Sequence, residues 1–281
     1  MRIIIFTGNE LRHNAFVKYL EFESKIKVLK VYKDKDIILK KKIKKRRSNT
    51  QELIHLENRY QSEKDFFSLF LEESKKKKKA NHFLVNKEYL SSKECCEEIE
   101  KLKPDLIILY GCSIIKGHVL SKFKNKILNV HLGLSPYYRG GGTNYFTFVN
   151  NEPEYAGVTF MYADSGIDTG KIIHQFRPRI YENDDFHTIG NRLIKDMFYV
   201  YKELIINFKI IKIKKIKITN NKRLIYKSGD FNELNIKKLY FNFQNNIIKK
   251  YLSNKAKRDK KVKIVQQEFI KEHYFKFLYN F

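Results

Sequence analysis

The chain has 281 residues, of which 42% are hydrophobic, with only four prolines and twelve glycines. This composition suits one large folded domain, or one catalytic domain with a small appendage, and excludes a fibrous or disordered chain. No run of about 18 apolar residues occurs, so we expect no membrane-spanning helix. The cysteines Cys95, Cys96 and Cys112 match neither a disulfide framework nor a zinc site, so we expect a reducing cytoplasm and no metal.

The formal net charge is +26 at pH 7, and 11 of the 57 basic residues are arginine. One interpretation is an electrostatic surface for nucleic acid or another polyanion. The other is a compositional bias that raises lysine together with isoleucine and asparagine. Arginine, whose planar group binds phosphate better, is scarce, and the lysines are spread over many segments. The pattern therefore favours the compositional interpretation.

The first half of the chain alternates short apolar runs with amphipathic segments. The first run is too short for a signal peptide and indicates a strand. The full pattern predicts strands at 2–7, 26–32, 83–85 and 105–110, and helices at 10–20, 51–71 and 92–102, the last capped by Ser92. The basic runs 40–47 and 75–79 are expected to be exposed. The fold class is therefore α/β: a Rossmann-like domain with a mostly parallel sheet and a site beyond the carboxyl ends of its strands.

A change in composition after residue 208 divides the chain into a domain over 1–208 and a short basic C-terminal extension over 209–281. In the extension we expect a half-exposed strand or hairpin at 211–218, a helix at 234–252 and a charged connector at 255–263. The apolar residues from Phe269 onward could pack on the core of the chain or form a homodimer interface, and we favour the core.

The segment Leu128-Asn129-Val130-His131 carries the first candidate site residues. On a strand, residues two apart project from one face, so Asn129 and His131 would present an amide and an imidazole side by side. Such a pair suits stabilisation of an oxyanion together with proton transfer. A histidine in an apolar strand is more often structural, so this pair does not decide the function by itself.

Three further motifs follow in the sequence, at Ser135 to Gly140 (S-P-Y-Y-R-G), Gly157 to Thr159 (G-V-T) and Gly166 to Gly170 (G-I-D-T-G). Between them we expect a helix at 144–149, a strand at 156–162 and a polar loop at 163–170. This order of motifs resembles the folate-dependent formyltransferase family, which includes methionyl-tRNA, glycinamide ribonucleotide and sugar N-formyltransferases. The resemblance is specific over 105–179 and extends at the level of the fold over 1–208.

The resemblance implies that 10-formyltetrahydrofolate is the co-substrate and that Asn129, His131 and Asp168 are the catalytic residues. Chemistry agrees, since Asn129 and a protonated His131 could donate to the oxyanion formed when an amine attacks the formyl carbon. Asp168 could orient the imidazole or relay the proton of the amine. Considered without the resemblance, an aspartate beside glycine is more often a turn-capping residue.

The resemblance also places the pterin of the donor against backbone groups of two loops. The expected donor-binding residues are Tyr110, Gly111, Cys112, Ser113, Ile114 and Ile115 on one loop, and Asp164, Ser165 and Gly166 on the other. Backbone donors and acceptors suit a flat heterocycle. Cys112 has no neighbour in the sequence that would activate its thiol, so we interpret it as part of the pocket wall.

The identity of the acceptor remains open at this point. The candidate acceptor-binding residues are Gly8, Asn9, Arg12, His13 and Arg139. A single glycine makes a poor phosphate cradle, although Arg12 and His13 could add charge there. The alternative for these two residues is an exposed helix turn.

Three functions are compatible with these motifs. The extension is short for the tRNA-binding barrel of methionyl-tRNA formyltransferase, which favours a small amine acceptor such as a nucleotide-linked amino sugar. Formylation of methionyl-tRNA is the second possibility. The third is a catalytically silent protein that binds RNA or an acidic partner, and the complete set of three candidate catalytic residues argues against it.

Overall fold

The computed structural model describes residues 1–35, 50–74, 80–214 and 223–270. Its main sheet has seven strands in the order β3-β2-β1-β4-β5-β7-β8, parallel from β3 through β5 and antiparallel at β7 and β8. The strands are β1 (Arg2–Thr7), β2 (Lys27–Asp34), β3 (Asn81–Val85), β4 (Leu106–Tyr110), β5 (Ile127–His131), β7 (Val158–Tyr162) and β8 (Ile172–Phe176). This confirms the α/β class and the mostly parallel sheet.

A second, two-stranded parallel sheet joins β6 (Tyr138–Gly140) to β9 (Leu224–Tyr226). The helices are α1 (Leu11–Glu21), α3 (Thr50–Glu73), α4 (Lys93–Leu102), α5 (Gly117–Lys122), α6 (Thr143–Val149), α7 (Phe186–Ile206), α8 (Glu233–Gln244), α9 (Ile247–Ser253) and α10 (Lys255–Lys260). Short 3-10 turns are η2 (Tyr89–Ser91), η3 (Pro153–Tyr155), η4 (Phe208–Ile210) and η5 (Ser228–Asp230). No helix within the described ranges has the length and apolar character needed to cross a bilayer.

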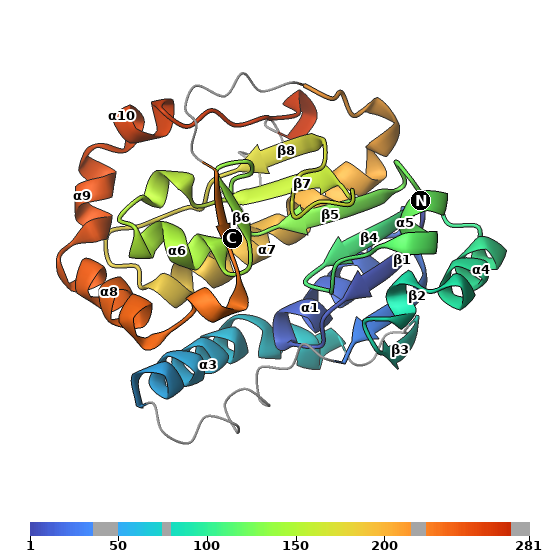
Figure 1. The fold of residues 1–281 in the computed structure, drawn as a ribbon, viewed down its shortest axis with the longest axis horizontal. Helices are drawn as coiled ribbons and strands as arrows, with labels where there is room; N and C mark the ends of the chain where they lie inside the picture. Colours follow the sequence, from blue (N-terminus) through green and yellow to red (C-terminus); the bar gives the residue numbers. More distant parts are fainter. Residues whose placement is uncertain (36–49, 75–79, 215–222, 271–281) are drawn as a thin grey trace.

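Both faces of the sheet are buried at its central strands β1, β4 and β5, as the continuous apolar runs predict, whereas the edge strand β3 is partly exposed. Alternate residues of β1 serve the two faces: Ile3 and Ile5 belong to the core formed with α1, α3 and α7, and Ile4 and Phe6 to the core formed with α4 and α5. A third core, built from α6, α8 and α9, includes Tyr138. Figure 1 shows α8, α9 and α10 gathered beside α6, at the end of the molecule opposite β2 and β3.

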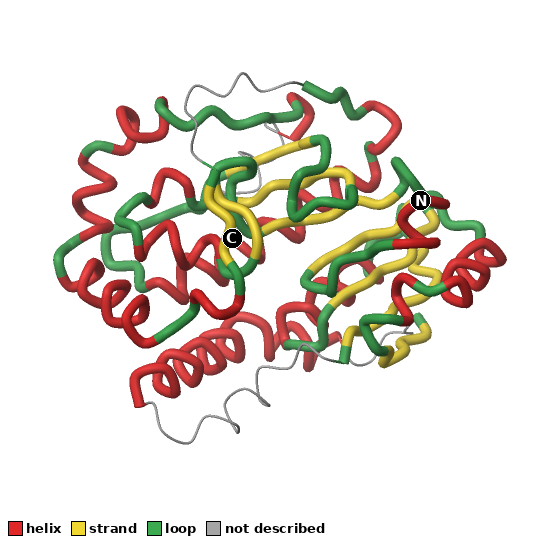
Figure 2. The backbone as a smooth tube through the Cα atoms, viewed as in Figure 1, coloured by secondary structure: helices red, strands yellow, loops and turns green. Residues whose placement is uncertain are grey.

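The chain beyond α10 covers the edge of the sheet at β8. The backbone N–H of Gln175 donates to the carbonyl of Val265 at 2.6 Å. Gln267 donates from its backbone to His174 Nδ1 at 3.0 Å and from its side chain to the carbonyl of Ile173 at 2.8 Å. Figure 2 shows this loop passing close to β8. Two outward backbone groups of β8, the N–H of Gln175 and the carbonyl of Ile173, are therefore paired within the chain.

Most elements predicted in the first half lie within a few residues of their expected ends. Ser92 caps α4 as expected, because its hydroxyl accepts a hydrogen bond from the backbone N–H of Cys95 at 3.1 Å. Helix α7 was not expected, although Asp185 provides its N-cap and its buried face is strongly apolar. The basic runs 40–47 and 75–79 lie outside the described residues.

Three expectations for the extension are corrected. The helix predicted at 234–252 is two helices, because Asn246 adopts a left-handed conformation with φ of 59°. The expected connector at 255–263 contains α10. Residues 211–214 form no strand, since the backbone of Lys212 pairs with the side-chain amide of Gln267 rather than with another strand, and 215–218 lie outside the described residues.

Near the C-terminal end, Phe269 packs against the core that α1, α3 and α7 form on the main sheet, and Ile270 is buried in that core. The expected core packing therefore holds for these two residues. The apolar residues that follow them lie outside the described part of the chain.

Candidate active site

A cavity of about 570 Å³ opens beyond the carboxyl ends of β1, β4 and β5, where the strand order reverses. This is the usual position for a ligand in an open parallel sheet. Its walls come from the start of α1, the loop after β4, the end of β5, the glycine loop after β6 and the loop after β7. It is lined by Asn129, His131 and Asp168, by the whole loop from Tyr110 to Ile115, and by Asp164 and Gly166, among others.

The three candidate catalytic side chains meet at Asp168. Its Oδ2 lies 3.2 Å from His131 Nδ1 and accepts a hydrogen bond from the backbone N–H of Gly140 at 2.9 Å. Its other oxygen accepts a hydrogen bond from the Asn129 side chain at 3.4 Å. Asn129 and His131 lie on the same face of β5, as the two-residue period predicts. The carboxylate thus connects the amide to the imidazole.

The second ring nitrogen of His131 is also surrounded by acceptors. Nε2 lies 2.9 Å from the carbonyl oxygen of Tyr138 and 3.2 Å from the hydroxyl of Thr143. That hydroxyl donates its own proton to the carbonyl of Leu132, so it can accept one from the ring. Both ring nitrogens of His131 therefore lie beside oxygen atoms, Nδ1 beside a carboxylate and Nε2 beside a carbonyl and a hydroxyl.

The loop after β7 is folded so that Asp168 points at β5. Asp164 accepts hydrogen bonds from the backbone N–H of Gly166 at 3.0 Å and from the hydroxyl of Thr169 at 2.8 Å. A Cβ at Gly166 would collide with Thr169, and one at Gly170 would collide with the carbonyl of Tyr162. The glycines of the G-I-D-T-G motif are therefore required by close packing, and Asp168 itself has φ of 52°.

The loop after β4 is fixed by Asp34, a buried residue at the end of β2 that sequence analysis did not identify. Its Oδ2 accepts hydrogen bonds from the backbone N–H of Ser113 at 3.1 Å and from its hydroxyl at 2.5 Å. Burial, with a smaller effect of Asp34, raises the pKa of Cys112 to about 12. Cys112 is therefore a protonated thiol in the cavity wall, in agreement with its interpretation from sequence.

Arg12 and His13 do not form an exposed helix turn. His13 is 1% exposed, and its Nδ1 accepts a hydrogen bond from the backbone N–H of Glu10 at 3.1 Å. Burial, together with the nearby charges of Arg12 and Arg59, lowers the pKa of His13 well below its usual value. The expectation that His13 adds positive charge is therefore wrong, because the ring is neutral where it lies. Arg12 forms an ion pair with Glu63 on α3.

A second cavity of about 330 Å³ lies on the other side of His131, between α3, α6, α7 and the start of the extension. The two cavities share the wall residues Arg12, His131, Leu132, Gly140 and Gly142. The second cavity is otherwise lined largely by aromatic and polar side chains, among them His55, Arg59, Glu63, Tyr145, Phe186, His187, Asn191 and Phe231. His131 is thus accessible from two compartments.

The polar groups of the second cavity differ in charge. Arg12 and Arg59 both contact Oε1 of Glu63, so two guanidinium groups share one carboxylate. Burial lowers the pKa of His55 to about 3 and that of His187 to about 4, so both rings are neutral at pH 7. The cavity therefore combines a net positive end with neutral aromatic walls that can form hydrogen bonds.

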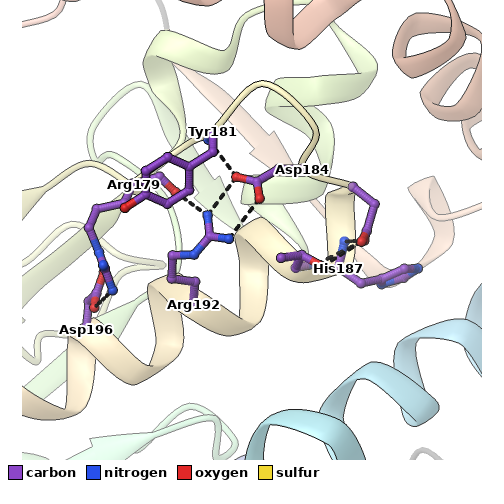
Figure 3. Close-up of polar contacts among 8 residues, drawn as sticks. Arg179, Tyr181, Asp184, His187, Arg192 and Asp196 are labelled. Atoms are coloured by element: carbon purple, nitrogen blue, oxygen red, sulfur yellow. Dashed lines mark hydrogen bonds and ion pairs between the residues drawn. The ribbon is translucent and has the colours of Figure 1, made fainter. Parts of the chain in front are cut away.

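Two arginine–aspartate pairs attach the loop between β8 and α7 to helix α7, whose first residues line this cavity. Arg179 binds both carboxylate oxygens of Asp196, at 2.8 and 2.9 Å, and Arg192 binds both of Asp184, at 2.6 and 2.8 Å. Figure 3 shows these contacts on one side of the start of α7, with the ring of His187 extending away from them toward α3. The centres of the rings of His187 and His55 are 4.8 Å apart.

Several expected residues line neither cavity, and others were missed. Ser165, Gly8, Asn9 and Arg139 are absent from both linings. Tyr226, from strand β9 in the extension, lines the first cavity although no motif pointed to it. The residues of α3 in the second cavity also lacked a sequence signal, because their polar positions are those of any amphipathic helix.

Comparison with known proteins agrees with this geometry. The family model described as formyl transferase matches residues 1–204. The chain is 36% identical over 92 residues to a protein named methionyl-tRNA formyltransferase from Finegoldia magna, covering 32% of this chain and 29% of that protein. It is 38% identical over 99 residues to another of that name from Alkaliphilus oremlandii, covering 34% of this chain and 31% of that protein. The matches thus span less than a third of these relatives.

Solved structures share the fold at low sequence identity. A phosphoribosylglycinamide formyltransferase from Anaplasma phagocytophilum superimposes with a TM-score of 0.52 at 18% identity, covering 81% of this chain and 99% of that one. A 4-N formyltransferase from Francisella tularensis gives a TM-score of 0.51 at 18% identity, covering 82% and 77%. These similarities establish a common fold, and the match over residues 1–204 establishes that the chain belongs to the formyl transferase family.

Proposed function

We propose that this protein transfers a formyl group from 10-formyltetrahydrofolate to the amine of a small acceptor. The observation that carries the proposal is the position of His131 in the wall between two cavities, in contact with Asp168, which also contacts Asn129. In the proposal the folate occupies the larger cavity and the acceptor the smaller one. The formyl carbon and the amine would then meet beside these three side chains.

The chemistry follows from the donors at the site. The amine nitrogen attacks the formyl carbon and forms a tetrahedral oxyanion, and the C–N10 bond of the donor then breaks to give a formamide and tetrahydrofolate. Asn129 has a second amide N–H beside the one directed at Asp168, and it can donate to the oxyanion. Asp168 can accept the proton lost by the amine and return one toward N10 with the help of His131 and water.

The larger cavity suits the folate donor. Its volume falls in the usual range for small-molecule sites, and its lining combines apolar side chains with backbone groups from the 110–115 loop. The loop is fixed in advance by Asp34, which reduces the conformational entropy lost on binding. Cys112, as a neutral thiol, adds to the apolar wall.

The smaller cavity suits a compact acceptor that carries both a ring and an anionic group. The aromatic side chains can pack against a ring, while the neutral His187 and Tyr145 can form hydrogen bonds with it. Arg12 and Arg59 can bind a phosphate at one end. An amino sugar attached to a nucleotide has these features, and we propose this class of acceptor.

Methionyl-tRNA is the second candidate acceptor, supported by the names of the curated relatives and by the net charge of +26. Residues 223–270 of the extension pack β9 and helices α8 to α10 against the first 208 residues, and Phe231 helps to line the smaller cavity. An extension that contributes to the wall of the acceptor cavity favours a small acceptor.

The deciding experiment measures tetrahydrofolate release and the formylated product by mass spectrometry. The purified chain is given 10-formyltetrahydrofolate with nucleotide-linked amino sugars, glycinamide ribonucleotide or methionyl-tRNA, and His131→Ala serves as the inactive control. Formylation of a small amine supports the proposal, and formylation of methionyl-tRNA alone supports the second candidate. No turnover, combined with RNA binding that falls steeply with salt, would instead indicate a silent binding protein.

A further inference from the structure

Strand β6 contacts both members of the His131–Asp168 pair through its backbone. The carbonyl of Tyr138, at its first residue, faces His131 Nε2 at 2.9 Å. The N–H of Gly140, at its last residue, donates to Asp168 Oδ2 at 2.9 Å. The separation between the imidazole and the carboxylate therefore depends on the position of a strand of three residues.

Strand β6 has one strand partner, β9, among the described residues. Leu224 donates its backbone N–H to the carbonyl of Tyr137 at 2.8 Å, and Gly141 donates to the carbonyl of Tyr226 at 2.9 Å. A Cβ on Gly140, whose φ is 89°, would collide with that carbonyl. The glycine is thus required by the approach of β9, which lies beyond the segment matched by the family model.

Side-chain contacts with α6 and with Asn150 also keep β6 and β9 together. The ring of Tyr226 stacks on Phe146 of α6, with 3.8 Å between centres and 6° between planes. Asn150 donates to the hydroxyl of Tyr226 at 2.8 Å and to that of Tyr138 at 3.0 Å. Since isolated short strand pairs are only marginally stable, this attachment to α6 is what keeps β9 against β6.

We propose that β9 is a positioning element of the active site and that Tyr226 is its positioning residue. The side chain of Tyr226 attaches β9 to α6, and β9 pairs with β6. The backbone of β6 in turn fixes the distance between the imidazole of His131 and the carboxylate of Asp168. The consequence for the reaction rests on the function proposed above. The spatial claim, that Tyr226 controls the environment of His131, does not depend on it.

The test compares Tyr226→Ala with Tyr226→Phe, and uses Ile225→Ala as the matched control. Ile225 is the neighbouring residue on β9, and its side chain is 47% exposed and lines neither cavity. We expect Tyr226→Ala to lower kcat by about 10- to 100-fold, the effect of a small displacement of reacting groups, with little change in the KM for folate. Tyr226→Phe, which keeps the stacked ring, should retain most activity, and Ile225→Ala should match the wild type.

A second readout follows the imidazole of His131 by nitrogen-detected NMR, with its signal identified by loss in His131→Ala. We expect this signal to shift in Tyr226→Ala and to stay in place in Ile225→Ala. If Tyr226→Ala does not fold, Tyr226→Leu, which keeps apolar bulk without a stacked ring, replaces it.

An unchanged His131 signal, or a change confined to the KM for folate, would overturn the proposal, because Tyr226 would then be a wall residue only. If the wild type transfers no formyl group, the proposed function fails, and the NMR comparison alone decides whether β9 positions His131.

Discussion

At the scale of the residue, Asp168 links the other two candidate catalytic side chains. Its carboxylate contacts an imidazole, a side-chain amide and a backbone N–H, while its backbone occupies the left-handed region at φ of 52°. Asparagine tolerates this conformation, so the charge can be removed without disturbing the loop.

We expect Asp168→Asn to lower kcat by about 10²- to 10⁴-fold, because the variant cannot take up the proton of the amine and has lost the negative charge beside His131. Steady-state kinetics of tetrahydrofolate release would measure this, with circular dichroism to check the fold. Asp65→Asn, at an exposed position on α3, is the matched control. Turnover in Asp168→Asn equal to that of the wild type would remove the assigned role.

At the scale of the element, α7 shows how a cap can influence a ligand site. Asp185 accepts hydrogen bonds from the backbone N–H groups of His187 at 2.7 Å and of Thr188 at 3.0 Å, at the free end of a helix of 21 residues. His187 belongs to this first turn and lines the smaller cavity. Loosening of the turn should therefore alter the smaller cavity, which is the proposed acceptor site, more than the larger cavity.

Asp185→Ala is expected to lower the free energy of unfolding by about 0.5–2 kcal/mol, the usual effect of losing an N-cap. It should also raise the KM for the acceptor while leaving the KM for folate unchanged. Urea denaturation and kinetics with each substrate varied in turn measure the two effects, and Glu182→Ala, an exposed change in the same loop, serves as comparison. Equal increases in both KM values would contradict a local effect on the smaller cavity.

The sequence predicted the sheet and the central motifs because both depend on local patterns. Apolar runs indicated buried strands, and the spacing of Asn129 and His131 placed both on one face of β5. The pairing of β6 with β9 joins residues more than eighty positions apart, so no local sequence pattern predicts that Tyr226 lies at the site. His13 was misjudged for a related reason, since its burial between Gly8 and Gly111 depends on the packing of two separate loops.

At the scale of the whole molecule, buried histidines make stability depend on pH. Burial lowers the pKa of His55 and His174 to about 3 and that of His187 to about 4, from an ordinary value of 6.5. Between these values the unfolded chain binds protons that the folded protein does not. The free energy of unfolding therefore decreases as the pH falls from 6.5 toward 4, and this contribution is constant above 6.5.

We expect the loss to approach about 1.4 kcal/mol per pH unit for each of these histidines well below its unfolded pKa. Urea denaturation at about pH 7 and about pH 5 would show it as a lower midpoint at the acid value. His118→Gln is the control, because His118 is exposed on α5 and its loss should leave the slope unchanged. A midpoint that does not move between the two pH values would contradict the neutral state of the buried rings.

The segment that covers β8 has a consequence for how the protein behaves at high concentration. An uncovered edge strand offers unpaired backbone groups to any extended chain that approaches, which is a common route to aggregation. Here Val265 and Gln267 already pair with two of those groups on β8, so association of copies through this edge would first require the segment to detach. Shortened versions of the chain that end before Val265 would leave the edge of β8 uncovered, and they should form insoluble assemblies more readily than the full chain.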